Sequence, residues 1–179
     1  MRPSVEVHDA LCRLVEYPRE GFPESVEEAA AAVSEACPSA WTSLEPFVAF
    51  ARKSSLGDLE EVFTRTFDNT DTRALEVGWH AFGENYTRGT FMVTVRGWLR
   101  DHGVEESSEL PDHLSHMLAV MGRMDAGRAG DLAVDTVGPA MVKVHDELVK
   151  LDNPWAGVLG AVLAVLEMHE RAPAETNHA

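Results

Sequence analysis

Apolar residues recur at helical spacing along almost the whole chain, and this repeat restricts the fold more than any other feature of the sequence. Leu11, Leu14 and Val15 show the spacing near the start, and residues 159–166 show it near the end. Apolar side chains that stand three and four positions apart share one face of a helix. No segment alternates apolar and polar residues as a half-buried strand would. We therefore predict an all-α fold.

Prolines, glycines and short polar loops divide the chain into about eight or nine predicted helices. Pro18 and Pro38 follow the first two, and Gly103 closes the sixth as a residue suited to a left-handed helix end. Residues 73–102 form two helices if the chain breaks at Gly89, and otherwise they form one broken helix. The predicted helices lie near 5–16, 24–36, 39–53, 57–67, 73–88, 90–102, 110–124, 130–151 and 154–168.

Length and composition favour one domain. A chain of 179 residues, 45% of them apolar, can bury well over half of its unfolded surface in a single core. We predict one helical domain over residues 1–170. Residues 171–179 are polar and lack periodicity, so we expect a flexible C-terminal tail.

The charge of the chain restricts its partners. Thirty acidic side chains against fifteen Lys and Arg give a net charge of −15, which repels nucleic acids and anionic lipid surfaces and attracts basic peptides. The most apolar run, residues 155–168, is shorter than the roughly 20 residues that cross a bilayer. We predict no nucleic-acid partner and no stable membrane insertion.

The N-terminus and the cysteines bear on location. Residues 1–18 mix charged and apolar residues and contain no continuous apolar stretch of the kind a secretory signal needs. Cys12 and Cys37 are isolated, without metal-type spacing, which is typical of a reducing compartment. We predict a cytoplasmic protein.

The stretch "ALEVGWHAFGENYTRG", residues 74–89, carries three glycines within a helical pattern. Each glycine in a helix interior costs roughly 1 kcal/mol relative to alanine, so Gly78 and Gly83 suggest that something approaches the backbone closely. Either a bound peptide or another helix of the same chain satisfies that requirement. One predicted helix face holds Leu75, Trp79, Phe82 and Tyr86, and a second holds Glu76, His80, Glu84 and Arg88.

The stretch "ELPDHLSHM", residues 109–117, has the pattern of a helix start. Pro111 suits the first turn, and Asp112 would meet the positive end of the helix. His113 and His116 are three positions apart on one face, a spacing compatible with zinc or iron if a carboxylate is near, although surface and capping histidines are far commoner. No HExxH, GxSxG, P-loop or GxGxxG motif accompanies them, so the sequence gives little reason to expect an enzyme.

Together, "LEVGWHAFGENYTRG" and "ESSELPDHLSHMLAVMGRM" resemble the nitrate reductase delta-subunit family, the NarJ-like assembly chaperones within the wider TorD- and DmsD-like group. The resemblance covers roughly residues 56–166. It implies a TorD-like helical fold and a cytoplasmic chaperone without enzymatic activity. Such a chaperone binds the N-terminal leader of a molybdenum-containing catalytic subunit until the molybdopterin cofactor is inserted. Where the wider group often has glutamate four residues after the histidine, this chain has Met117, which favours the nitrate reductase branch.

The resemblance also implies a partner and a site. The partner is the catalytic molybdopterin subunit, bound through its N-terminal peptide, with cofactor-delivery proteins as further candidates; the chaperone itself needs no cofactor or metal. The family's signature falls on Glu109, Pro111, Asp112 and His113. The predicted peptide-binding residues are Glu76, Trp79, His80, Phe82, Glu84, Tyr86, Arg88, Glu109, Pro111, Asp112, His113 and His116.

Two other functions stay open at this point. A small helical metalloenzyme would use His80, His113 and His116 with a carboxylate, and would contain stoichiometric metal. A helical adaptor would keep the peptide-binding surface but serve no molybdoenzyme.

Overall fold

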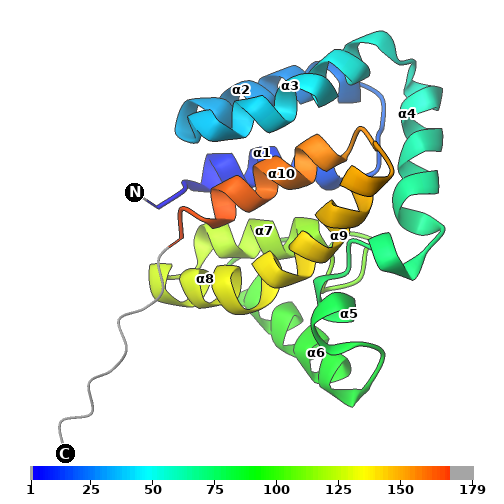
Figure 1. The fold of residues 1–179 in the computed structure, drawn as a ribbon. Helices are drawn as coiled ribbons and strands as arrows, with labels where there is room; N and C mark the ends of the chain where they lie inside the picture. Colours follow the sequence, from blue (N-terminus) through cyan, green and yellow to red (C-terminus); the bar gives the residue numbers. More distant parts are fainter. Residues whose placement is uncertain (1, 170–179) are drawn as a thin grey trace, which may run out of the picture.

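The computed structural model describes residues 2–169, and in that range the fold is all-α, as predicted (Figure 1). The N-terminal half contains α1 (Val5–Val15), α2 (Phe22–Ala36), α3 (Pro38–Lys53) and α4 (Leu56–Phe63). The C-terminal half contains α5 (Val77–Phe82), α6 (Tyr86–Asp101), α7 (Leu114–Arg123), α8 (Ala126–Leu132), α9 (Gly138–Lys150) and α10 (Ala156–Leu166). Short π-helical turns, Thr64–Asp68 and Ala133–Val137, follow α4 and α8, and a 3-10 turn spans Asp71–Arg73.

Side-chain caps explain several helix starts. The Ser4 hydroxyl accepts a hydrogen bond from the Val7 N–H at the start of α1. Ser55 and Asp58 form a reciprocal capping box on α4. Each cap satisfies backbone N–H groups that the first turn of a helix leaves without partners.

The helices pack in layers around a core that joins both ends of the chain. The pair α2 and α3 lies at one end, α1 and α10 lie in the middle, and α7 and α8 lie beneath them, with α9 rising from α8 along the side of α10 (Figure 1). The most extensive contacts join α1 to α7 and α10 to α3. Trp155 is fully buried at the start of α10, where its ring packs against Phe47 and Phe63. No helix in residues 2–169 has the length and apolar character needed to cross a bilayer.

The predicted helix over 73–88 is wrong. The chain forms two helices there, because Gly83 adopts a left-handed φ of 74° and the Asn85 side chain caps α6. The break therefore lies at residues 83–85, and Gly89 lies inside α6. Since the two helices are separate, the predicted faces from Leu75 to Tyr86 and from Glu76 to Arg88 are not continuous.

Two other predicted boundaries also differ from the structure. The helix expected from residue 110 begins at Leu114, because residues 110–113 form a turn that pairs with another segment. The helix expected over 130–151 is divided into α8, a π-helical turn and α9. The predicted domain boundary at residue 170 and the tail 171–179 lie outside the described residues.

Candidate functional site

A short backbone pairing brings the two sequence motifs together. Glu76 and His113 form an isolated antiparallel bridge. The Val77 N–H donates to the Asp112 carbonyl at 2.8 Å, and the Leu114 N–H donates to the Leu75 carbonyl at 2.9 Å. Residues 75–77, which precede α5, are thus fixed beside residues 112–114, which lead into α7.

Asp112 is buried in an ion pair and does not act at a helix start as predicted. Its carboxylate has no exposed surface, and the Arg88 guanidinium binds both oxygens, with Nε to Oδ2 at 2.9 Å and Nη2 to Oδ1 at 3.3 Å. The guanidinium also lies 5.6 Å from the centre of the Trp79 ring. The residue that caps α7 is His113. Asp112 instead connects α6 to the turn before α7.

The close approach expected at Gly78 is made by this ion pair. A methyl group built on Gly78 would lie 2.5 Å from Oδ2 of Asp112 and 3.3 Å from Cγ of Arg88. Real side-chain carbons do not come so near to an oxygen. In the structure the close approach to Gly78 therefore comes from the same chain, from side chains of α6 and the turn before α7, which is one of the two explanations left open by the sequence.

His113 is a neutral histidine with one donor left over. Its Nδ1 accepts hydrogen bonds from the Ser115 backbone N–H at 3.2 Å and from the Ser115 hydroxyl at 2.8 Å. Burial lowers the pKa of His113 to about 4, with a smaller contribution from His116. Since Nδ1 accepts from an N–H, the ring proton is on Nε2. That Nε2–H has no hydrogen-bond partner among residues 2–169.

The other two histidines of the predicted alternative metal site have structural partners. His116 Nδ1 donates to the Leu110 carbonyl at 2.9 Å, and its Nε2 accepts from the Ser107 N–H at 3.0 Å. His80 Nε2 lies 2.7 Å from the Ala74 carbonyl oxygen. Within residues 2–169, no three His, Cys, Asp or Glu side chains are grouped so that they could hold a metal ion.

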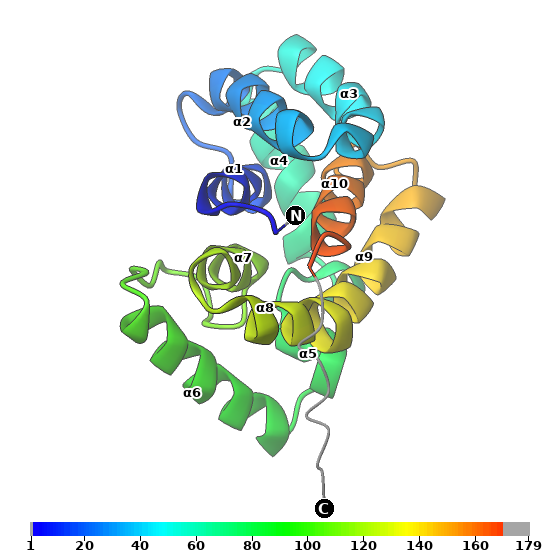
Figure 2. The ribbon, with the colours of Figure 1, turned by 90° about the vertical axis from the view of Figure 1, so that its left-hand side faces the viewer.

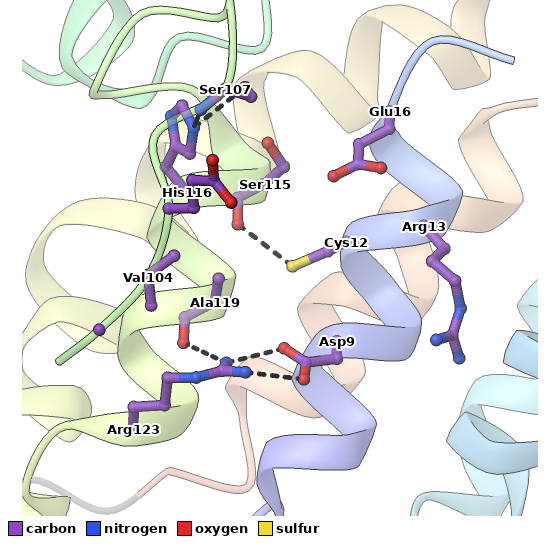
Figure 3. A pocket seen from close by; sticks show the side chains of 12 residues that line it. Asp9, Cys12, Arg13, Glu16, Val104, Ser107, Ser115, His116, Ala119 and Arg123 are labelled. Atoms are coloured by element: carbon purple, nitrogen blue, oxygen red, sulfur yellow. Dashed lines mark hydrogen bonds and ion pairs between the residues drawn. The ribbon is translucent and has the colours of Figure 1, made fainter. Parts of the chain in front are cut away.

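His116 also borders a cavity of about 360 Å³ between α1, α7 and residues 103–107 (Figure 3). Arg123 spans one side of it and binds both carboxylate oxygens of Asp9, at 2.7 and 2.9 Å. The Cys12 thiol donates to the Ser115 carbonyl at 3.1 Å, and burial raises its pKa, which keeps it protonated. The charged pair and the thiol in this cavity are thus already partnered within the fold.

A second cavity, of about 280 Å³, lies beside the backbone pairing, and we call it the acidic pocket. Four carboxylates line it, and none of them has a Lys, Arg or His partner within 4 Å in the described part of the chain. Its acidic and histidine lining is Asp68, Asp71, Glu76, Glu109 and His113, and its other lining residues are Phe63, Phe67, Thr70, Ala74 and Leu75.

The acidic pocket disfavours its own negative charge. Burial raises the pKa of Glu76, and the nearby carboxylates of Asp112 and Glu109 add to this, while a backbone hydrogen bond and Arg88 offset it in part. Burial also raises the pKa of Asp68. A bound cation would relieve this repulsion, so the acidic pocket is suited to a positively charged group.

The remaining predicted residues lie around the acidic pocket or away from it. Trp79 and Phe82 are half-buried on α5, and Phe82 begins an aromatic row that continues to Phe91 at 5.1 Å and then to Trp98 at 6.4 Å on α6. Tyr86 is 90% exposed at the start of α6. Glu84 is exposed in the loop between α5 and α6 and does not line the acidic pocket.

Sequence reasoning missed the contribution of the chain between α4 and α5. Asp68 ends a π-helical turn, and Asp71 begins the 3-10 turn that follows. The sequence "DNTDT" at 68–72 is a polar segment of the kind that forms a loop. Its clustered acids were the one available signal, but nothing in the sequence placed them beside Glu109.

The family of the chain follows from comparison with known proteins. A family profile described as the nitrate reductase delta subunit matches residues 22–160. The chain belongs to this family. The delta-subunit family is known for molybdoenzyme assembly chaperones and is an assembly family, not a catalytic one. The matched range contains the whole acidic pocket and the Arg88–Asp112 pair. A search of curated proteins gave no match.

Proposed function

We propose that this delta-subunit family member is a cytoplasmic chaperone for a nitrate reductase-type oxidoreductase. It binds the N-terminal leader of the molybdenum-containing catalytic subunit and holds that subunit until the molybdenum cofactor is inserted, before membrane attachment or export. The observation that carries this proposal is the acidic pocket, with four carboxylates that lack ion-pair partners among residues 2–169.

The charge of the protein and the aromatic row both suit a basic amphipathic peptide. The net charge of −15 attracts such a peptide over a distance, and the acidic pocket supplies local carboxylates. The half-buried aromatic row on α5 and α6 supplies an apolar surface at the side of the Arg88–Asp112 pair. A peptide helix would place its apolar side chains on this row and its positive groups in the acidic pocket.

The residues have separate roles in this proposal. Glu76, Glu109 and His113 contact the leader, and Trp79, Phe82 and Tyr86 form the adjacent apolar contact. Arg88, Pro111 and Asp112 hold the shape of the site. His80 and His116 stabilise the backbone on either side through the hydrogen bonds described above. No residue acts in catalysis, and the chaperone requires no cofactor.

Calorimetric titration with the N-terminal peptide of the catalytic subunit from the same organism tests the proposal. We expect a Kd in the micromolar range or tighter, which corresponds to about −8 kcal/mol or better. Affinity should fall with added salt but not vanish, because salt screens the carboxylates and leaves apolar burial intact. Glu76→Gln should weaken binding several-fold and flatten the salt dependence.

Glu84→Gln is the matched control, since it removes the same charge from the loop outside the acidic pocket. It should bind nearly as wild type does. Absence of heat and of any tryptophan fluorescence change at high peptide concentration would refute leader binding. Binding without any effect on cofactor insertion into the client would indicate an adaptor instead of an assembly chaperone.

A further inference from the structure

The acidic pocket offers two kinds of hydrogen-bonding group to a ligand. Its four carboxylates can only accept hydrogen bonds when they are ionised. His113 supplies a donor, because its Nδ1 is occupied by Ser115 and its Nε2–H has no partner among residues 2–169. The two ring nitrogens are on different edges, so the edge that carries Nε2 is turned away from Ser115. His113 is itself 95% buried and forms part of the pocket wall, while its Nε2 atom keeps contact with solvent, so a ligand that covers this donor has to supply an acceptor in place of water.

A lysine or arginine side chain meets only half of this requirement. Both carry several donors for the carboxylates, but neither has an acceptor at its charged end. With such a side chain in the acidic pocket, the His113 Nε2–H would stay without a protein partner. A donor that loses its water on binding and gains no other partner weakens binding.

The free end of a polypeptide meets both requirements within a single residue. Its α-amino group is mostly protonated at pH 7 and supplies three donors for the carboxylates. The carbonyl oxygen of the same residue is an acceptor for the Nε2–H of His113. The cavity of about 280 Å³ has a wall of Phe63, Phe67 and Leu75, against which the first side chain can pack.

We propose that the acidic pocket binds the free N-terminal amino group of the client's leader, with its carboxylates around the ammonium and His113 Nε2–H on the first carbonyl oxygen. This inference rests on the proposed function, since it names the part of the leader that the pocket recognises. The chaperone then recognises the N-terminal residue of the leader through its amino group and its carbonyl oxygen. Internal basic residues of the leader contribute mainly through long-range attraction to the acidic surface.

Three versions of one synthetic peptide test the inference with the full chain. The first is the N-terminal 20-residue sequence of the catalytic subunit with a free amine. The second is the same peptide with an acetylated N-terminus, which removes the terminal charge. The third keeps the free amine and replaces every internal Lys and Arg with Gln. We expect acetylation to raise Kd at least tenfold and the Gln replacements to raise it less than acetylation does.

Variants of the protein test whether the acidic pocket is responsible for the weaker binding of the acetylated peptide. The ratio of Kd for the acetylated peptide to Kd for the free peptide should fall to less than about threefold in Glu109→Gln and in His113→Asn. Asparagine keeps an oxygen that can cap α7, while its shorter side chain withdraws from the acidic pocket. Glu109 is exposed, so Glu109→Gln tests the inference even if His113→Asn folds poorly. Glu105→Gln removes a charge from the same segment outside the acidic pocket, and it should keep the wild-type ratio.

The possible outcomes separate the two proposals. If the free and acetylated peptides bind within twofold of each other while the Gln peptide loses binding, the acidic pocket accepts a basic side chain and the inference is wrong. If a tenfold ratio persists in both Glu109→Gln and His113→Asn, the amine binds elsewhere and the inference is also wrong. If none of the three peptides binds, the proposed function itself fails.

Discussion

Helices α10 and α6 are attached to the molecule in opposite ways. Six of the eleven residues of α10 are buried, and Gly157 lies so near α3 that an added methyl group would overlap the Ser43 carbonyl oxygen. Only Val95 and Leu99 are buried among the sixteen residues of α6, which lies at the edge of the molecule below α7 and α8 (Figure 2). Apolar burial thus holds α10, whereas α6 buries only two residues, packs Phe91 and Trp98 against the core less completely, and adds polar contacts to the rest of the molecule.

The polar contacts of α6 are also the ones that shape the site. Arg88, near the start of α6, binds buried Asp112, and the residues on either side of Asp112 pair with the segment that contains Glu76. Fully burying an aliphatic side chain contributes about 1.5 to 3 kcal/mol to stability. The stability of α10 is therefore divided among several buried side chains, and none of them is decisive alone. Around α6, one ion pair joins the helix to the acidic pocket, and its loss should affect both.

Asp112→Ala should have the largest effect. Removing one partner of a buried ion pair leaves the other charge uncompensated, and we expect the free energy of unfolding to fall by about 3 to 5 kcal/mol. Chemical denaturation monitored by circular dichroism measures this. Glu106→Ala is the control, because it removes the exposed ion-pair partner of Arg96, another arginine of α6. This variant should change stability little.

A double variant, Arg88→Met with Asp112→Leu, sharpens this test. It removes both charges together, so it should recover much of the lost stability. If Asp112→Ala unfolds no more easily than Glu106→Ala, α6 does not depend on the buried pair, and the contrast with α10 disappears.

Acid should destabilise the site through His113. The folded state holds its pKa at about 4 against an ordinary value of 6.5, so the unfolded chain takes up the proton first. The resulting stability is complete above about pH 6.5 and is lost as pH falls towards 4, by about 3 kcal/mol at most. His113→Asn should flatten the fall in unfolding free energy between pH 6.5 and 4.

Comparing this variant with wild type at each pH isolates His113 from other titrating groups. The pKa of Glu76 is raised, so its contribution has the opposite sign. Away from the site, His8 on α1 and His169 after α10 face each other with their Nε2 atoms 3.1 Å apart, and burial lowers both of their pKa values. Acid sensitivity that remains in His113→Asn is expected from this pair. An unchanged pH dependence would show that His113 is not held neutral by the fold.

The two regions also differ in how well the sequence predicts them. Apolar spacing predicted α1 and α10 closely, because helices that pack on a core carry their burial pattern in the local sequence. The break before α6 was missed because the aromatic spacing from Trp79 to Tyr86 continues across it. The glycine at 83 and the asparagine cap at 85 were the competing signals, and they determine the structure.

Part of the lining of the acidic pocket was named from the sequence. Glu76 came from the stretch at 74–89, and Glu109 and His113 came from the resemblance to the delta-subunit family; the structure places these three residues in one pocket. Asp68 and Asp71 come from a loop whose position depends on tertiary contacts, so no local pattern revealed them. The partnership of Arg88 with Asp112 spans 24 residues and has no signature in spacing or composition.

Gly78→Ala should affect stability less than Asp112→Ala or the protonation of His113. It tests whether the Asp112 carboxylate is the group that requires glycine at this position of α5. The added methyl would displace the Asp112 carboxylate and press on Phe91, and such overpacking typically costs about 1 to 3 kcal/mol. Gly89→Ala is the matched control on α6, because no atom lies within 4 Å of its added methyl. Since alanine suits a helix interior better, Gly89→Ala should raise stability by about 0.5 to 1 kcal/mol.

Peptide binding in the same two variants separates the two explanations of Gly78. If the Asp112 carboxylate is what Gly78 accommodates, Gly78→Ala lowers the melting temperature, and any loss of affinity follows from the displaced ion pair. A Gly78→Ala protein that melts as wild type does yet binds the leader more weakly would show that the peptide itself packs on this backbone. Glycine would then have been selected here for the client, and α5 would be a contact surface in its own right.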